Sequence, residues 1–139
     1  MGGLIGTASK NNTGLMSNEW AIRTINKDSS YPAVALDIDL TDVGQMAQLF
    51  IGVSNVGGVS CLIALSAVRW NATIVYAKLI VGSIPNNLSL SYILDTKLHI
   101  YMAAGGYTLF YVYPILAQYN SVLSSVSSIP SGTTNISYT

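Results

Sequence analysis

The sequence predicts an all-β protein: a single antiparallel β-sandwich, jelly-roll-like, with an extended N-terminal arm and one short N-terminal helix. Apolar and polar residues alternate in several short segments between residues 31 and 117, and turn-forming Gly, Asn, Asp and Pro residues separate these segments. Successive side chains of a strand point to opposite faces of a sheet, so alternation indicates strands with one buried face. The length of 139 residues suits one domain of this kind.

The N-terminal part divides into two predicted elements. Residues 1–16 are rich in Gly, Ser, Thr and Asn and too poor in apolar side chains to form a core, which predicts an extended arm. Residues 17–27 predict a short helix, because Ser17 can cap the first free N–H groups and Glu19 falls in the first turn.

The body, residues 31–117, contains seven strand-like segments. The first alternates apolar and acidic residues strictly, and the last three alternate as well. The second, third and fourth are apolar and β-branched enough for strands that are covered on both faces. A polar, Ser- and Thr-rich tail over residues 118–139 is predicted to follow. The seven segments are 36–40, 48–53, 59–68, 73–81, 88–92, 97–102 and 107–113.

Charged residues are unusually sparse. Six acidic and six basic residues cancel, whereas about 35 charges are expected in an ordinary chain of this length. A surface with so few charged side chains and no net charge favours association with other protein surfaces or with lipid. The chain is therefore expected either to enter lipid or to bury much of its surface against copies of itself or other proteins.

Two long uncharged stretches raise the membrane alternative. One runs from Asp42 to Arg69 and the other follows His99, and both are long enough for a membrane helix. Gln, Ser, Asn and Gly interrupt them, with turn chemistry at 55–58, and no Lys/Arg cluster marks a cytoplasmic side. We therefore predict no membrane insertion.

Catalytic, metal and cofactor sites are not predicted. Zero net charge without a basic cluster argues against nucleic-acid binding. Cys61 is the single cysteine, and its apolar neighbours favour a buried, inert thiol over a zinc ligand or nucleophile. His99 is expected to face solvent from a strand, and Asp37 and Asp39 are expected on a solvated strand face. The protein is predicted not to be an enzyme.

One N-terminal segment carries a family resemblance. The residues from Thr7 to Glu19 read TASKNNTGLMSNE. This segment resembles the "TASK…GLMSxE" segment that recurs in bacteriophage fibre and tail proteins, with Asn12 and Thr13 as extra residues and a more apolar continuation. The match covers about a tenth of the chain. The resemblance implies a homotrimeric structural protein located in the virion, with other virion proteins as partners.

A chain of this length leaves no room for a long shaft. A short head fibre or capsid decoration is therefore the favoured expectation, docked on a capsid or fibre-docking protein. The alternatives are a tail-associated receptor-binding tip and a non-viral carbohydrate-binding or adhesin module. A host-surface glycan is a further candidate partner.

Candidate contact residues follow from these expectations. Leu4 and Ile5 would anchor the arm in the virion. Trp20, Ile22 and Ile25 form an apolar stripe on the predicted helix, either for trimer contacts or for packing on the chain's own sheet. Exposed aromatic side chains stack on sugars, although tyrosine is also favoured in cores and interfaces. The glycan-contact candidates are Tyr92, Tyr101, Tyr107, Tyr111 and Tyr113.

Overall fold

The computed structural model describes residues 7–8, 15–16, 22–26, 33–55, 57–116 and 121–139. Throughout these residues the regular elements are strands, and no helix occurs among them. The strands are β1 Thr7–Ala8, β2 Leu15–Met16, β3 Ile22–Asn26, β4 Ala33–Ile38, β5 Met46–Asn55, β6 Ser60–Trp70, β7 Ala72–Gly82, β8 Ser89–Leu94, β9 Leu98–Ala103, β10 Thr108–Leu116, β11 Ser121–Val126 and β12 Thr134–Asn135.

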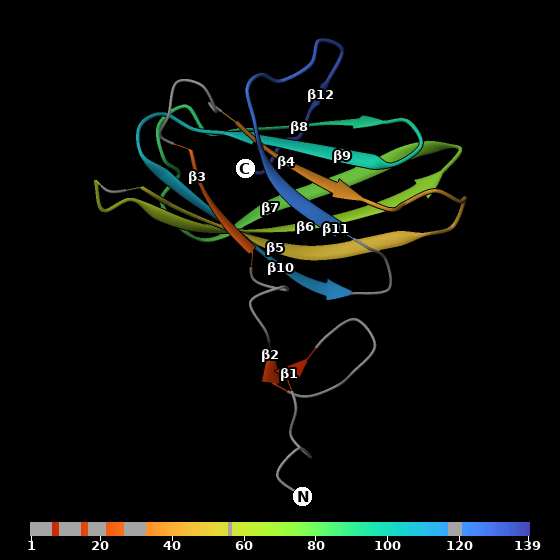
Figure 1. Cartoon of the computed structure of the whole chain (residues 1–139), viewed down its shortest axis with the longest axis horizontal. Coiled ribbons are helices and arrows are strands. Elements are labelled where there is room, and N and C mark those ends of the chain that lie inside the picture. The colour runs from red at the N-terminus through yellow and green to blue at the C-terminus, as the bar shows by residue number, and fades with distance from the viewer. Residues whose placement is uncertain (1–6, 9–14, 17–21, 27–32, 56, 117–120) are drawn as a thin grey trace, which may run out of the picture.

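Two antiparallel sheets pack face to face in the described part of the chain (Figure 1). The first sheet has the order β3-β10-β5-β6-β7, and the second has the order β11-β4-β9-β8-β12. This arrangement confirms the predicted antiparallel β-sandwich. The connections β3–β4, β4–β5, β7–β8, β9–β10 and β10–β11 all cross from one sheet to the other, as many connections do in jelly rolls. All seven predicted strand segments correspond to strands, β4 to β10.

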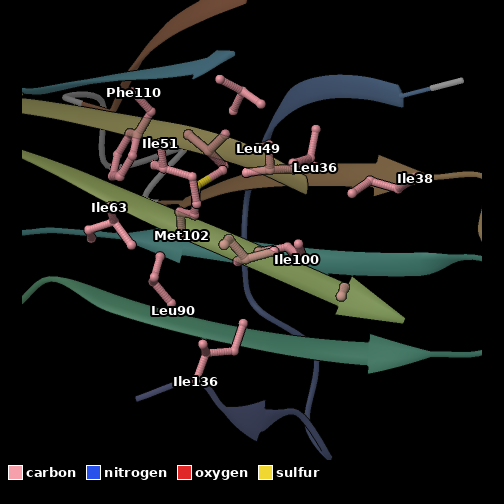
Figure 2. Close-up of a cluster of buried hydrophobic side chains, with 14 of the residues drawn as sticks. Leu36, Ile38, Leu49, Ile51, Ile63, Leu90, Ile100, Met102, Phe110 and Ile136 are labelled. Atoms are coloured by element: carbon pink, nitrogen blue, oxygen red, sulfur yellow. The ribbon is translucent and has the colours of Figure 1, made fainter. Parts of the chain in front are cut away.

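The core lies between the two sheets. Inward-facing residues of β5 and β6 alternate with less buried ones, and the side chains of Ile51 and Ile63 are fully buried. Figure 2 shows them close to Phe110 from β10 and facing Leu90 and Ile100 from the second sheet. Each such side chain contributes about 1.5–3 kcal/mol when it is fully buried. The buried cluster therefore accounts for the face-to-face packing of the sheets.

The predicted helix over residues 17–27 is wrong where the structure describes it. Ile22–Asn26 is strand β3, antiparallel to β10 at the edge of the first sheet. Residues 17–21 and 27 lie outside the described part. Three of the five residues of β3 are β-branched, which favours extended backbone. Pairing with β10 also gives hydrogen-bond partners to backbone N–H and C=O groups along the whole segment, whereas the predicted Ser17 cap would satisfy only those at the start of a helix.

The polar tail predicted over residues 118–139 contributes two strands, β11 and β12, to the second sheet. Strand β11 pairs with β4 along six residues, and β12 pairs with β8. Ile136 is 5% exposed and belongs to the buried cluster. An edge strand with one solvated face needs few apolar residues, so its composition resembles that of a tail.

Residues 136–138 join the two sheets, and we call them the C-terminal strap. The Ile136 N–H donates to the Leu90 carbonyl of the second sheet at 2.8 Å. The Leu79 N–H of the first sheet donates to the Tyr138 carbonyl at 2.6 Å, and the Tyr138 hydroxyl donates to the Leu88 carbonyl at 2.6 Å. The strap therefore links the two sheets on the side of the sandwich where β7 and β12 are the edge strands.

Candidate functional site

The outward side of the first sheet is apolar. On β7, Val75, Ala77 and Leu79 pack against the core, so the alternate residues Ile74 and Tyr76 point away from it. A bulge opposite Leu62 and Ile63 leaves Ile80 and Val81 both exposed. We call this surface the outer apolar face. It consists of the exposed side chains Met46, Trp70, Ile74, Tyr76, Ile80, Val81 and Tyr113, with the half-buried Phe50, Leu62, Val68, Leu109 and Tyr111 between them.

Strand register places these side chains in rows across the sheet, with polar residues such as Gln48, Ser54 and Ser66 among them. Tyr113 pairs with Phe50 across β10 and β5, and Phe50 pairs with Ala64 of β6. Tyr111 pairs with Gly52, and a Cβ at Gly52 would lie 3.5 Å from the Tyr111 Cβ. This is an ordinary van der Waals distance, so Tyr111 packs directly beside position 52 on the outer face. Among the described outward residues of β5, β6, β7 and β10, Lys78 is the one charged side chain.

The sheet side that carries the outer apolar face is as large as one side of a protein interface. Strands β6 and β7 each contain 11 residues. At about 3.3 Å per residue and about 4.8 Å between strands, the outward side of the four strands covers on the order of 700 Å², polar residues such as Gln48 and Ser66 included. Each partner in a standard interface buries about 800 Å². This side of the sheet is therefore large enough for a contact surface.

The outward side of the second sheet is charged instead. Lys97 forms an ion pair with Asp39 at 3.1 Å. His99 on β9 lies directly opposite Asp37 on β4. Its Nδ1 is 2.6 Å from Asp37 Oδ1, and its Nε2 is 2.8 Å from Asp95 Oδ1. Within the described residues, the ion pairs thus gather on one side of the sandwich and the apolar face occupies the other.

The Asp37–His99–Asp95 cluster favours the protonated imidazole. Burial alone would lower the pKa of His99, but the hydrogen bonds and charges of both carboxylates outweigh it and raise that pKa. The Lys97 backbone N–H and the His99 side chain lower the pKa of Asp95. Both ring nitrogens face carboxylates, so neither is available to activate a nucleophile. The arrangement ties β4 to the β8–β9 hairpin in a pH-dependent way.

His99 points outward from its strand, as predicted, but neighbouring side chains cover most of it. Its side chain is 20% exposed and held on both sides, and the Tyr101 ring stacks beside it with centroids 6.5 Å apart. The Asp37 carboxylate, expected on a solvated face, is one of the two that hold it. Cys61 is buried, as predicted, and burial raises the pKa of its thiol.

Three loops meet at one end of the sandwich around a pocket of about 440 Å³. They are the β5–β6, β7–β8 and β9–β10 connections. Asn55 Nδ2 donates to the Gly105 carbonyl at 3.2 Å, and the Gly57 N–H donates to Asn55 Oδ1 at 2.7 Å. The Gly105 N–H donates to the Asn86 carbonyl at 2.9 Å. We call this site the loop pocket; its lining is Asn55, Gly57, Val59, Pro85, Asn86, Asn87, Gly105 and Gly106.

The five candidate tyrosines do not form one platform. Tyr111 and Tyr113 lie on the outer apolar face, and Tyr101 lies beside His99 on the second sheet. Tyr92 packs against the core from β8, and Tyr107 is half-buried just before β10. Tyrosines with alternating spacing share a face only within one strand, which is why the set divides among strands.

The remaining candidates concern the N-terminal segment. Leu4, Ile5 and Trp20 lie outside the described residues. Ile22 and Ile25 belong to β3, where they pair with Val112 and Leu109 of β10, so they are not part of a helical stripe. In the arm, β1 and β2 form a short parallel pair.

Sequence reasoning did not single out Tyr76, Ile80 and Val81 as exposed apolar side chains. The signal was present, because the segment 73–81 was expected to be covered on both faces. The described part of the chain covers only the inward face of this strand, and these three side chains stay exposed. When a strand is apolar on both faces and its own chain buries only one of them, the exposed face is a candidate contact surface.

No helix in the described ranges is long and apolar enough to cross a membrane. The same residues contain no group of three or more His, Cys, Asp or Glu side chains arranged to hold a metal ion. No family model, no curated protein and no solved structure matches the chain.

Proposed function

We propose that this protein is a structural component of a bacteriophage virion: a short homotrimeric fibre, with a head fibre or capsid decoration favoured over a tail-associated tip. The observation that carries the proposal is the outer apolar face. The TASKNNTGLMSNE segment supports the phage assignment and the trimer, because it resembles a segment of phage fibre proteins.

A second copy of the chain is the best match for the outer apolar face. Tyr76 and Val81 are 67% and 61% exposed, and full burial of such side chains contributes about 1.5–3 kcal/mol each. Lys78 is the one charged side chain among the described outward residues of these four strands, so the face offers few ion pairs to a charged partner. In a trimer, this face would contact a different surface of the next copy, because interfaces around a three-fold axis are heterologous. Obligate interfaces between copies are large and apolar, as this face is.

Association is tested by the mass of the protein in solution. Sedimentation equilibrium at micromolar concentration should give three times 14.8 kDa for the wild type. Val81→Glu places a charge on the outer apolar face and should weaken association at least tenfold, because the carboxylate would have to lose its water. Val122→Glu is the matched control, since Val122 is 58% exposed on β11 of the second sheet.

Two outcomes contradict the proposed trimer. A monodisperse wild-type monomer removes the need for a partner copy altogether. A Val81→Glu variant that keeps the trimeric mass would show that the outer apolar face is not the interface.

The virion assignment has its own experiment. Mass spectrometry of purified particles of the phage that encodes the chain should find it at a fixed ratio to the capsid protein. Gold-labelled antibodies should then place it on the head. Label on the tail would favour the receptor-binding tip, and absence from the particles would favour a non-viral adhesin module.

A further inference from the structure

The loop pocket has an uncharged, polar lining. Three asparagines and three glycines supply most of it, with Val59 and Pro85 as the apolar members. Its volume of about 440 Å³ lies within the range of roughly 300–1,000 Å³ that is typical of ligand sites. Loops held at the end of a rigid β-sandwich are also where binding residues commonly lie. The lining contains no carboxylate, amine or guanidinium that would select an ion.

The pocket is held in place before any ligand arrives. The bonds from Asn55 to Gly105 and from Gly105 to Asn86 fasten the three loops to one another. A Cβ at Gly105 would lie 3.3 Å from both the Asn86 carbonyl oxygen and Asn87 Nδ2. The glycine therefore lets the loops approach closely and places the Asn87 amide against the pocket floor. A preformed site loses less conformational entropy on binding.

Two side-chain amides in the lining are free to bind. The side-chain amides of Asn86 and Asn87 have no hydrogen-bond partner among the described residues. Each amide offers two donor hydrogens and an acceptor oxygen side by side. Two neighbouring hydroxyl groups of a sugar ring are complementary to such an amide, because one can donate to the amide oxygen while the other accepts from the amide N–H.

We infer that the loop pocket binds a neutral carbohydrate, one hexose or N-acetylhexosamine ring, through the amides of Asn86 and Asn87. The inference goes beyond the trimeric assembly and concerns a surface separate from the outer apolar face. In a fibre, which is the proposed function, such a site would contact neutral glycans of the host surface.

The inference is tested by titrating the full chain, labelled with ¹⁵N, with glucose, galactose, mannose and N-acetylglucosamine. At least one neutral sugar should cause saturable shifts of the Gly57, Gly105 and Gly106 amide signals, at millimolar Kd. N-acetylneuraminic acid, which carries a carboxylate, should bind at least tenfold more weakly because no cation in the lining can pair with it.

Two variants test whether the side-chain amides of Asn86 and Asn87 bind the sugar. Asn87 has φ of +58°, so Asn87→Gly removes the amide at a backbone angle that glycine adopts freely. Asn86→Ala keeps the carbonyl that accepts from Gly105. Each variant should weaken sugar binding at least tenfold. Asn71→Gly is the matched control, because Asn71 also has a positive φ, +36°, and lies in the β6–β7 turn outside the pocket lining; it should bind like the wild type.

The inference is overturned if no neutral sugar gives saturable shifts up to about 50 mM, a range that covers millimolar affinities. It is also overturned if Asn87→Gly and Asn86→Ala both bind as the wild type does, or if the anionic sugar binds equally well. The sedimentation mass of the same samples is measured in parallel. Loss of sugar binding with a trimeric mass rejects the pocket alone, whereas a monomeric mass with intact sugar binding rejects the assembly alone.

Discussion

His99 illustrates how a residue that looks unremarkable in the sequence acquires a defined chemical state. Its two nitrogens lie 2.6 Å and 2.8 Å from carboxylate oxygens of Asp37 and Asp95. Both contacts are best satisfied when both nitrogens carry hydrogen, which is the charged form of the ring. The raised pKa of His99 and the lowered pKa of Asp95 agree with that state.

The pH dependence of stability should reveal this charge. A raised folded-state pKa means that His99 stabilises the fold fully below its unfolded pKa and that this contribution is lost as pH rises through the folded value. The lowered pKa of Asp95 means that its contribution is lost as pH falls through its own folded value. His99→Gln should therefore lower the Tm more at about pH 5 than at about pH 9.

Thermal denaturation followed by circular dichroism measures the effect. Lys97→Gln is a useful control, because it removes the neighbouring exposed ion pair with Asp39, which contributes about 0–1 kcal/mol. A Tm difference between His99→Gln and the wild type that is equal at both pH values would contradict the assigned charge.

At the scale of the strand, the end of β7 depends on Gly82. Its φ is +97°, and an added Cβ would collide with the Ser60 carbonyl oxygen and lie 2.8 Å from the Cys61 Cα. Both contacts involve the backbone of the neighbouring strand, which cannot move without disturbing the bulge beside it. Gly44 has a similar φ of +89°, but a Cβ added there would have no other atom within 4 Å.

The two glycines make a matched pair for mutation. Gly44→Ala should cost about 1–2 kcal/mol of unfolding free energy from backbone strain alone. Gly82→Ala should cost clearly more, because the collision with β6 adds to the same strain. Urea denaturation of both variants measures the difference. Equal losses would mean that the β6–β7 pairing gives way more easily than its geometry indicates.

The strands differ in how well local sequence predicts them. Strands β4 to β10 follow from alternation and turn residues, because a two-residue period is a property of the segment itself. Strands β3 and β11 lie at sheet edges, and they form because β10 and β4 offer unpaired backbone there. The contact of His99 with Asp37 depends on which strands become neighbours, a choice made by the whole fold. The loop pocket joins three separate connections for the same reason.

At the scale of the whole molecule, the sandwich presents two unlike sides. The charge deficit predicted association, but it did not say where on the molecule association would occur. The sheet order brings the apolar outward residues of β5, β6, β7 and β10 onto one side, which is the surface proposed for association. The arm precedes this body, and the buried cluster of the described residues begins at Val34.

Deleting residues 2–13 should therefore leave a folded trimer that no longer enters virions. The deletion removes Leu4 and Ile5, the predicted anchors, and keeps every residue of the described buried cluster. Circular dichroism and sedimentation test the fold and the mass, and a virion pull-down with tagged protein tests incorporation. The double variant Leu4→Ser, Ile5→Ser should show the same defect with the arm's length preserved. Normal incorporation of the truncated chain would place the attachment surface elsewhere, and a failure to fold would assign the arm to the core.

The C-terminal strap also affects the order in which the strands of this protein pair. The β5–β6 and β6–β7 hairpins join neighbouring segments, whereas the β4–β11 pair and the bonds made by Ile136 and Tyr138 join segments far apart in the sequence. Pairings between such distant segments form late, because the intervening chain must first be brought together. The hairpins are therefore expected to form first, and the strap is expected to tie the two sheets together only afterwards.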